Sequence, residues 1–268
     1  MATPIRPPAV AGTFYPGSKA DLSALVDRLL LGAAPAPTRQ VPKAIVVPHA
    51  GYIYSGAIAA SAFKLFEPLR NTLKRIILLG PAHRVYLDGL ASPGAAALST
   101  PLGLVPVDSE MLSRIPEVAA DPRAHAHEHS LEVEIPFLQR VAPYAKVVPL
   151  VVGHASPEAV GEVLERLWDG PDTRIVVSSD LSHYLPYDQA RMTDARTARR
   201  ICELGAHPIG PEEACGAGGI NGLLWVARRR HLRGELIDLR TSGDTAGTRD
   251  EVVGYGAFAF YEDDKPLS

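Results

Sequence analysis

Two apolar runs of this sequence each stop at a histidine. The run Ala44–Val47 is followed by proline and His49, and the run Arg75–Leu79 is followed by glycine, proline, alanine and His83. A hydrophobic core gains nothing from imidazoles at the ends of buried strands, whereas a metal ion or a polar substrate would use them as ligands or proton carriers. The pattern therefore indicates chemistry at these two positions.

A third apolar run, Thr173–Val177, leads into Ser-Ser-Asp-Leu-Ser-His, which contains Asp180 and His183. In open α/β sheets, ligands bind beyond the carboxyl ends of the parallel strands. If the three runs are parallel neighbours, His49, His83 and His183 converge at one edge of the sheet. A serine hydrolase is disfavoured for this segment because the chain has no G-x-S-x-G turn.

Cys215 is a further candidate, because it lies in a glycine-rich turn before an apolar helical segment. Backbone N–H groups at such a turn favour the thiolate form of a cysteine. We expect His49, His83 and Cys215 to hold one transition-metal ion, with zinc, iron and copper all compatible with two imidazoles and a thiolate. Cys202, inside an amphipathic segment, is expected to be a small buried hydrophobe.

The tract 124–134 is rich in histidine and glutamate. His125 and His127 are predicted to belong to a polar loop that leads into a helix. His129 and Glu132 differ, because residues three apart share one face of a helix. They would either point into the metal-binding cleft as hydrogen-bonding groups or cap the helix, and the sequence leaves both roles open.

The elements that must position these residues are continuous apolar runs without alternation, as is typical of strands covered on both faces. The runs are Ala44–Val47, Arg75–Leu79, Lys146–Val152 and Thr173–Val177. Helices are predicted at Ser18 (as N-cap) to Leu31, Gly56–Leu65, Ser130–Val141, Pro157–Trp168, Tyr187–Leu204 and Ile220–Arg230. Their alternation predicts a single α/β domain over residues 1–268, with a mostly parallel sheet and helices on both faces. A hairpin at the sheet edge is expected within Leu90–Asp108, and late strands at Glu235–Leu239 and Glu251–Tyr261.

Composition narrows the class of protein. The 268 residues are 46% hydrophobic and carry a formal net charge of -3, which favours neither nucleic acid nor an anionic membrane as a partner. Two cysteines argue against a disulfide-stapled secreted protein. With no signal-peptide pattern and no run of about 20 apolar residues, the chain is predicted to be cytoplasmic.

The motifs taken together resemble the Memo family, the B component of the AmmeMemoRadiSam system. They are PAVAGTFYP at 8–16, VPHAGYIYSG at 47–56, LLGPAH at 78–83, EHSLEVEIPF at 128–137, VVPLVVG at 147–153, SSDLSHY at 178–184, CGAGGI at 215–220 and TSGD at 241–244. The resemblance implies a three-layer α/β/α sandwich similar to the class III extradiol ring-cleavage dioxygenases. It places His49, His83 and Cys215 at the metal, His183 as acid/base with Asp180 close by, and His129 in the cleft.

The cysteine departs from those dioxygenases, which have a carboxylate as third ligand. A thiolate is softer and oxidisable, so ring cleavage does not follow from the fold alone. Two functions are therefore expected. One is a metal-dependent redox enzyme acting on an unknown small molecule, with His183, Asp180 and His129 as catalytic residues. The other is a non-catalytic metal- or peptide-binding adaptor. The system's name implies a radical-SAM protein and the A component as partners.

Four tyrosines lie near these histidines in the sequence, and either line an aromatic wall of the cleft or pack around the strand ends, which we favour. They are Tyr52, Tyr54, Tyr184 and Tyr187.

Overall fold

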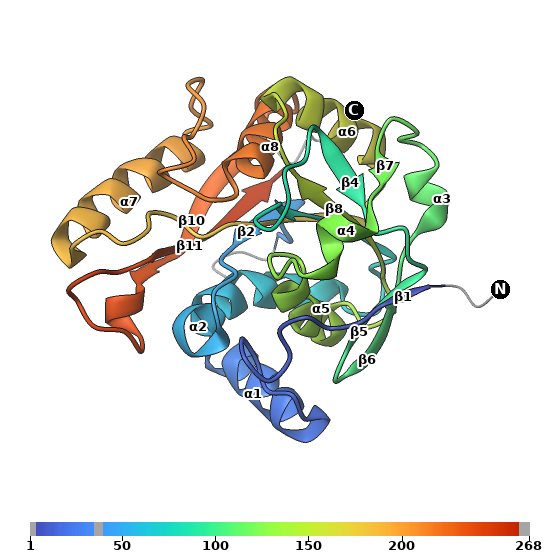
Figure 1. Ribbon diagram of the computed structural model, residues 1–268. Coiled ribbons are helices and arrows are strands. Elements are labelled where there is room, and N and C mark those ends of the chain that lie inside the picture. Colours follow the sequence, from blue (N-terminus) through green and yellow to red (C-terminus); the bar gives the residue numbers. More distant parts are fainter. Residues whose placement is uncertain (1–3, 35–39, 263–268) are drawn as a thin grey trace.

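An eight-stranded sheet forms the centre of the protein (Figure 1). The structure is a computed structural model and describes residues 4–34 and 40–262. The strand order is β10-β11-β2-β9-β3-β8-β4-β7. Its strands are β2 Ala44–Val47, β3 Arg75–Pro81, β4 Leu90–Ser92, β7 Ala119–Ala120, β8 Lys146–Val152, β9 Thr173–Ser178, β10 Arg233–Thr241 and β11 Gly254–Tyr261.

The sheet is mixed. Its four central strands, β2, β9, β3 and β8, are parallel, as the apolar runs predicted. The prediction of a mostly parallel sheet is not confirmed for the whole, because β11 runs antiparallel to both β10 and β2, and β4 runs antiparallel to β8. Antiparallel neighbours need no crossover helix, so β10 and β11 are joined through residues 242–253 without an α-helix between them.

The hairpin expected at the edge of the central sheet lies elsewhere. Strands β5 Ala97–Thr100 and β6 Gly103–Pro106 form it, and they join β1 Ile5–Arg6 in a separate three-stranded sheet. From the same stretch of sequence, β4 pairs with the central sheet, and Val107 forms an isolated bridge to Val147 of β8. The N-terminal arm therefore pairs with the hairpin and lies across the molecule near α5 (Figure 1).

Helices cover both faces of the central sheet (Figure 1). Side chains alternate along each strand, so Ile45 and Val47 pack with α1, α2 and α5, while Ala44 and Val46 pack with α6 and α8. None of the described helices is both long and apolar enough to cross a membrane. The helices are α1 Lys19–Gly32, α2 Tyr52–Phe63, α3 Ser109–Leu112, α4 Pro122–Ala126, α5 Ile135–Val141, α6 Pro157–Leu167, α7 Tyr187–Cys202 and α8 Ala217–Arg229, with 3₁₀ turns η1 Lys64–Leu69, η2 Glu132–Glu134 and η3 Ser242–Asp244.

The segment 130–141 is not the single helix that the sequence predicted. It folds as the 3₁₀ turn η2 followed by α5, with Pro136 in the first turn of α5. Proline suits that position because it lacks the N–H that an α-helix start leaves unpaired. The α-helix therefore begins only at Ile135, and the preceding residues are free to fold tightly around the histidines.

Candidate metal centre

The carboxyl ends of three parallel strands meet at one edge of the sheet. Strand β9 lies between β2 and β3, with Val47 opposite Ser178 and Leu79 opposite Val177. This arrangement confirms the expected convergence of the strand ends. The residues that follow β2 and β3 include His49 and His83, and those that follow β9 include Asp180.

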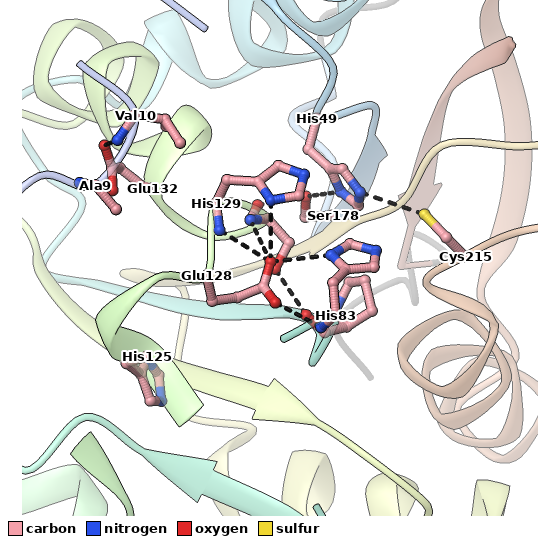
Figure 2. Close-up of polar contacts among 12 residues, drawn as sticks. Ala9, Val10, His49, His83, His125, Glu128, His129, Glu132, Ser178 and Cys215 are labelled. Atoms are coloured by element: carbon pink, nitrogen blue, oxygen red, sulfur yellow. Dashed lines mark hydrogen bonds and ion pairs between the residues drawn. The ribbon is translucent and has the colours of Figure 1, made fainter. Parts of the chain in front are cut away.

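Three imidazoles cluster at this edge (Figure 2). His49, His83 and His129 each offer a nitrogen, and these atoms lie within 4.8 Å of one another. Nitrogen ligands of a tetrahedral ion sit about 3.4 Å apart, so the rings need to move by only about an ångström to share one ion. His129, which the sequence placed beside the metal rather than on it, is thus a third candidate imidazole ligand.

Glu128 organises two of these histidines and was missed at the level of sequence. Its Oε1 accepts hydrogen bonds from His83 Nδ1 at 3.0 Å and from the backbone N–H groups of His129 and Ser130, each at 2.9 Å. Its Oε2 accepts from His83 N at 2.5 Å. Four donors thus converge on one carboxylate that is 2% exposed. The available signal is the acidic residue directly before His129, inside the tract 124–134 that is rich in histidine and glutamate.

The ionisation of Glu128 fixes the orientation of His83. Burial alone would raise the pKa of Glu128, but the hydrogen bonds and charge of His83 and the backbone N–H bonds lower it to about 2. An ionised carboxylate only accepts hydrogen bonds, so His83 donates from Nδ1 and presents the lone pair of Nε2. Burial lowers the pKa of His129 to about 4. Its Nδ1 is buried, 3.4 Å from Glu128 Oε1, and makes no hydrogen bond within residues 4–34 and 40–262.

His49 is the most deeply buried of the three, at 2% exposure. Its Nδ1 lies 2.7 Å from Ser178 Oγ, and its backbone N–H donates to Asp180 Oδ1 at 2.8 Å. Burial lowers the pKa of His49 well below its usual value, and the nearby rings of His83 and His129 add to the shift. The ring is therefore neutral at physiological pH, as a metal ligand must be.

Cys215 lies next to His49, with Sγ 3.3 Å from His49 Nε2 (Figure 2). The turn before α8 is held against the end of β9, because Gly216 N–H donates to Ser179 Oγ at 2.9 Å. A Cβ at Gly216 would come within 2.5 Å of the Ser178 carbonyl oxygen, so this close approach requires glycine. The glycine-rich turn thus carries the sulfur to the histidines.

The thiolate form predicted for Cys215 is not favoured by the polypeptide's own groups. Burial, reinforced by the Asp180 carboxylate, raises the pKa of the thiol to about 12, although backbone N–H bonds oppose the shift. Burial also raises the pKa of Asp180 to about 7. Cys215 is therefore a neutral thiol unless a cation displaces its proton.

His183 is half-buried at the end of β9, and its ring contacts Tyr184 with centroids 5.8 Å apart. Burial lowers the pKa of its imidazole. Among the described residues, no hydrogen bond joins His183 to Asp180, whose carboxylate binds the backbone of His49 instead.

Tyr184 has a φ of 56° and is 71% exposed, an unusual conformation for a residue with a bulky side chain. Tyr52 is buried and donates to the Val133 carbonyl at 2.6 Å, so it packs rather than lines a wall.

Glu132 and His125 serve the structure around the site. Glu132 accepts hydrogen bonds from Tyr15 Oη at 2.6 Å and from the backbone of Ala9 and Val10, and it pairs with Arg6. It therefore anchors the N-terminal arm and does not face the histidines. His125 donates from Nε2 to a backbone carbonyl at 2.9 Å and lies apart from the cluster (Figure 2). His127 is exposed.

The donor set fits a borderline or soft transition metal. It combines imidazoles oriented by hydrogen bonds, a buried His129 nitrogen with no hydrogen bond in the described part of the chain, and a thiol beside His49. Fold and site together define an α/β protein with a histidine-rich candidate metal centre at the carboxyl edge of its sheet.

The sequence matches the Memo-like protein family over residues 6–259. It is 37% identical over 272 residues to a MEMO1 family protein of Aquifex aeolicus, covering 96% of this chain and 99% of that one. A MEMO1 family protein of Archaeoglobus fulgidus is 35% identical with the same coverage. One of Caldivirga maquilingensis is 34% identical over 291 residues, again covering 96% of this chain and 99% of that one. The chain therefore belongs to the Memo-like family, which confirms the family seen in the motifs.

Proposed function

We propose that the candidate metal centre binds one transition-metal ion through His49, His83 and Cys215, with His129 beside it, and that the protein uses this ion in redox chemistry on a small molecule. The observation that carries the proposal is the convergence of the imidazole donors of His49, His83 and His129 within 4.8 Å of one another. Imidazole nitrogens that converge in this way at the edge of a sheet suit a transition-metal cation.

A bound iron or copper ion would supply electron transfer and polarise an oxygen of the substrate or of dioxygen. The side chains of the protein would bind the ion, orient its ligands and transfer protons. The hydrogen bond to Glu128 orients His83, and the Ser178 contact does the same for His49. His183 is the proposed acid/base, because its lowered pKa leaves a neutral imidazole able to accept a proton near pH 7.

The proposed relationship to class III extradiol dioxygenases is supported by helices on both faces of a sheet whose central strands are parallel. Such an α/β/α arrangement opens its ligand sites at the carboxyl ends of the strands. A radical-SAM protein and the A component of the AmmeMemoRadiSam system are proposed partners. Asp180, which holds the backbone of His49, is proposed to keep that ligand in place rather than to orient His183.

The test is dioxygen uptake by protein loaded anaerobically with Fe(II) or Cu(I), with ascorbate as the reductant. His183→Ala should lower the rate by a factor of about 10² or more, as loss of a general acid or base does, while leaving the metal content unchanged. His127→Ala, a histidine-to-alanine change at an exposed position, serves as the matched control. Equal rates for wild type and His183→Ala would contradict the assigned proton transfer.

A further inference from the structure

Ser178 Oγ has three close polar neighbours at the end of β9. His49 Nδ1 and the Ser130 carbonyl oxygen each lie 2.7 Å away, and Glu134 Oε1 lies 2.9 Å away. Ser178 and Glu134 are 0% and 1% exposed. Water from the surface therefore cannot supply a donor or an acceptor here. Each of the three contacts must be explained by the protons that these groups carry.

Glu134 is a buried carboxyl that has no cationic partner among residues 4–34 and 40–262. Its Oε2 makes no hydrogen bond within the described part of the chain, and its Oε1 contacts only Ser178. Burial raises the pKa of Glu134 well above its usual value, Ser178 opposes the shift and Asp180 adds to it. A carboxyl in this setting stays protonated and can donate a hydrogen bond.

Counting protons gives one arrangement in which all three contacts are hydrogen bonds. A serine hydroxyl has one proton to donate and two lone pairs to accept with. The Ser130 carbonyl can only accept, so it takes the proton of Ser178. The two remaining neighbours must then both donate to Ser178, His49 from Nδ1–H and Glu134 from its carboxyl O–H. An ionised Glu134 would leave two oxygens facing each other without a proton between them.

We propose that Glu134 and Ser178 are positioning residues that hold His49 as the Nδ1–H tautomer and thereby turn its Nε2 lone pair toward the candidate metal centre. The contact of Cys215 Sγ, 3.3 Å from Nε2, agrees with this assignment, since a thiol can donate to that lone pair. This inference rests on the proposed function only in taking His49 as a ligand. The tautomer itself is a property of the polypeptide.

The segment 128–134 thus orients two ligands with carboxyls in opposite ionisation states. Glu128, held ionised by four N–H donors, accepts directly from His83. Glu134, which has no such donors, acts as a neutral acid and reaches His49 through a serine.

The experiment is long-range ¹H–¹⁵N NMR of ¹⁵N-histidine-labelled, chelator-treated full-length protein, with His49 assigned by the loss of its signals in His49→Gln. Wild type should show the Nδ1–H tautomer, and so should Glu134→Gln, whose amide N–H replaces the carboxyl donor. Ser178→Ala should lose that preference. An Nε2–H tautomer of His49 in wild type would overturn the proposal, even if neither Ser178→Ala nor Glu134→Gln folds.

A zinc titration gives the second readout. Ser178→Ala and Glu134→Leu should bind zinc about 10- to 100-fold more weakly, as expected when a group that orients a ligand is lost, while Glu134→Gln stays near the wild-type affinity. If Ser178→Ala and Glu134→Leu both bound zinc as tightly as wild type, the positioning role of Ser178 and Glu134 would be overturned. If wild type binds no zinc, iron or copper yet shows the Nδ1–H tautomer, the proposed function fails and the tautomer assignment stands.

Discussion

Glu128→Gln tests how strongly one carboxylate organises the candidate metal centre. Glutamine keeps the size of the side chain and one acceptor oxygen, but its amide group cannot accept from the backbone N–H of His83, which lies 2.5 Å from Oε2. A buried N–H left facing another donor costs about 1–3 kcal/mol. Glu128 is 2% exposed, so solvent cannot replace the lost bond.

The pKa of Glu128 gives a second route to the magnitude. A fall from 4.5 to about 2 corresponds to roughly 3 kcal/mol of stabilisation. Glutamine keeps an acceptor oxygen for three of the four donors, so we expect the variant to lose only part of this amount, about 2 kcal/mol at pH 7. Because the folded-state pKa is lowered, the contribution is complete above pH 4.5 and is lost as the pH falls toward 2. The difference between wild type and variant should shrink over that window.

The assay is urea unfolding of wild type and Glu128→Gln at pH 7, together with a zinc titration in which the variant should bind about 10- to 100-fold more weakly. Glu117→Gln is the matched control, because Glu117 pairs with Arg166 while both side chains are nearly half exposed. That change should stay within about 0.5 kcal/mol. If Glu128→Gln matched this control in stability and the wild type in affinity, the assigned role of Glu128 would be refuted.

Three further changes have defined outcomes. Gly216→Ala should destabilise by about 1–3 kcal/mol in urea because its Cβ would meet backbone at 2.5 Å, whereas Gly32→Ala, with open space around it, should not; equal effects would be evidence against the tight turn. Burial lowers the pKa of His125 to about 4, so stability should fall as the pH drops from 6.5 toward 4, by up to about 1.4 kcal/mol per unit, and His125→Gln should flatten that slope in unfolding curves at several pH values. Tyr15→Phe removes a buried bond to Glu132 and should cost about 1–3 kcal/mol in thermal or urea unfolding; an unchanged midpoint would contradict the anchoring of the arm.

The parts of the fold that sequence predicts well are those fixed by burial on both faces. The limits of β2 and β8 match the apolar runs, and β9 extends the predicted strand by one residue. The helix start at Ser18 is confirmed, since its side chain accepts from Asp21 N–H. The two late strands are confirmed as β10 and β11. Their antiparallel place at one side of the sheet could not be predicted, because β10 is only partly buried and lacks a continuous apolar run.

The candidate site likewise has residues that the sequence predicts and residues that it does not. Strand ends predicted that His49 and His83 would meet, because parallel neighbours share an edge. Glu128 and Glu134 were not predicted, since their partners are 45 and 44 residues away in the sequence. A signal did exist for Glu134, a carboxyl inside the run Leu-Glu-Val-Glu-Ile-Pro-Phe. The helical periodicity of the segment predicts a surface position for Glu134. The structure shows instead that Glu134 is buried in the turn η2.

Metal content and absorption spectra of protein purified anaerobically, wild type against Cys215→Ser, test the central claim most directly. We predict about one iron, copper or zinc ion per wild-type chain. After substitution with Co(II), we predict a thiolate-to-metal charge-transfer band that Cys215→Ser abolishes while its metal content falls. A wild-type protein that takes up no transition metal, or a Cys215→Ser variant with unchanged content and spectrum, would contradict the proposed metal centre.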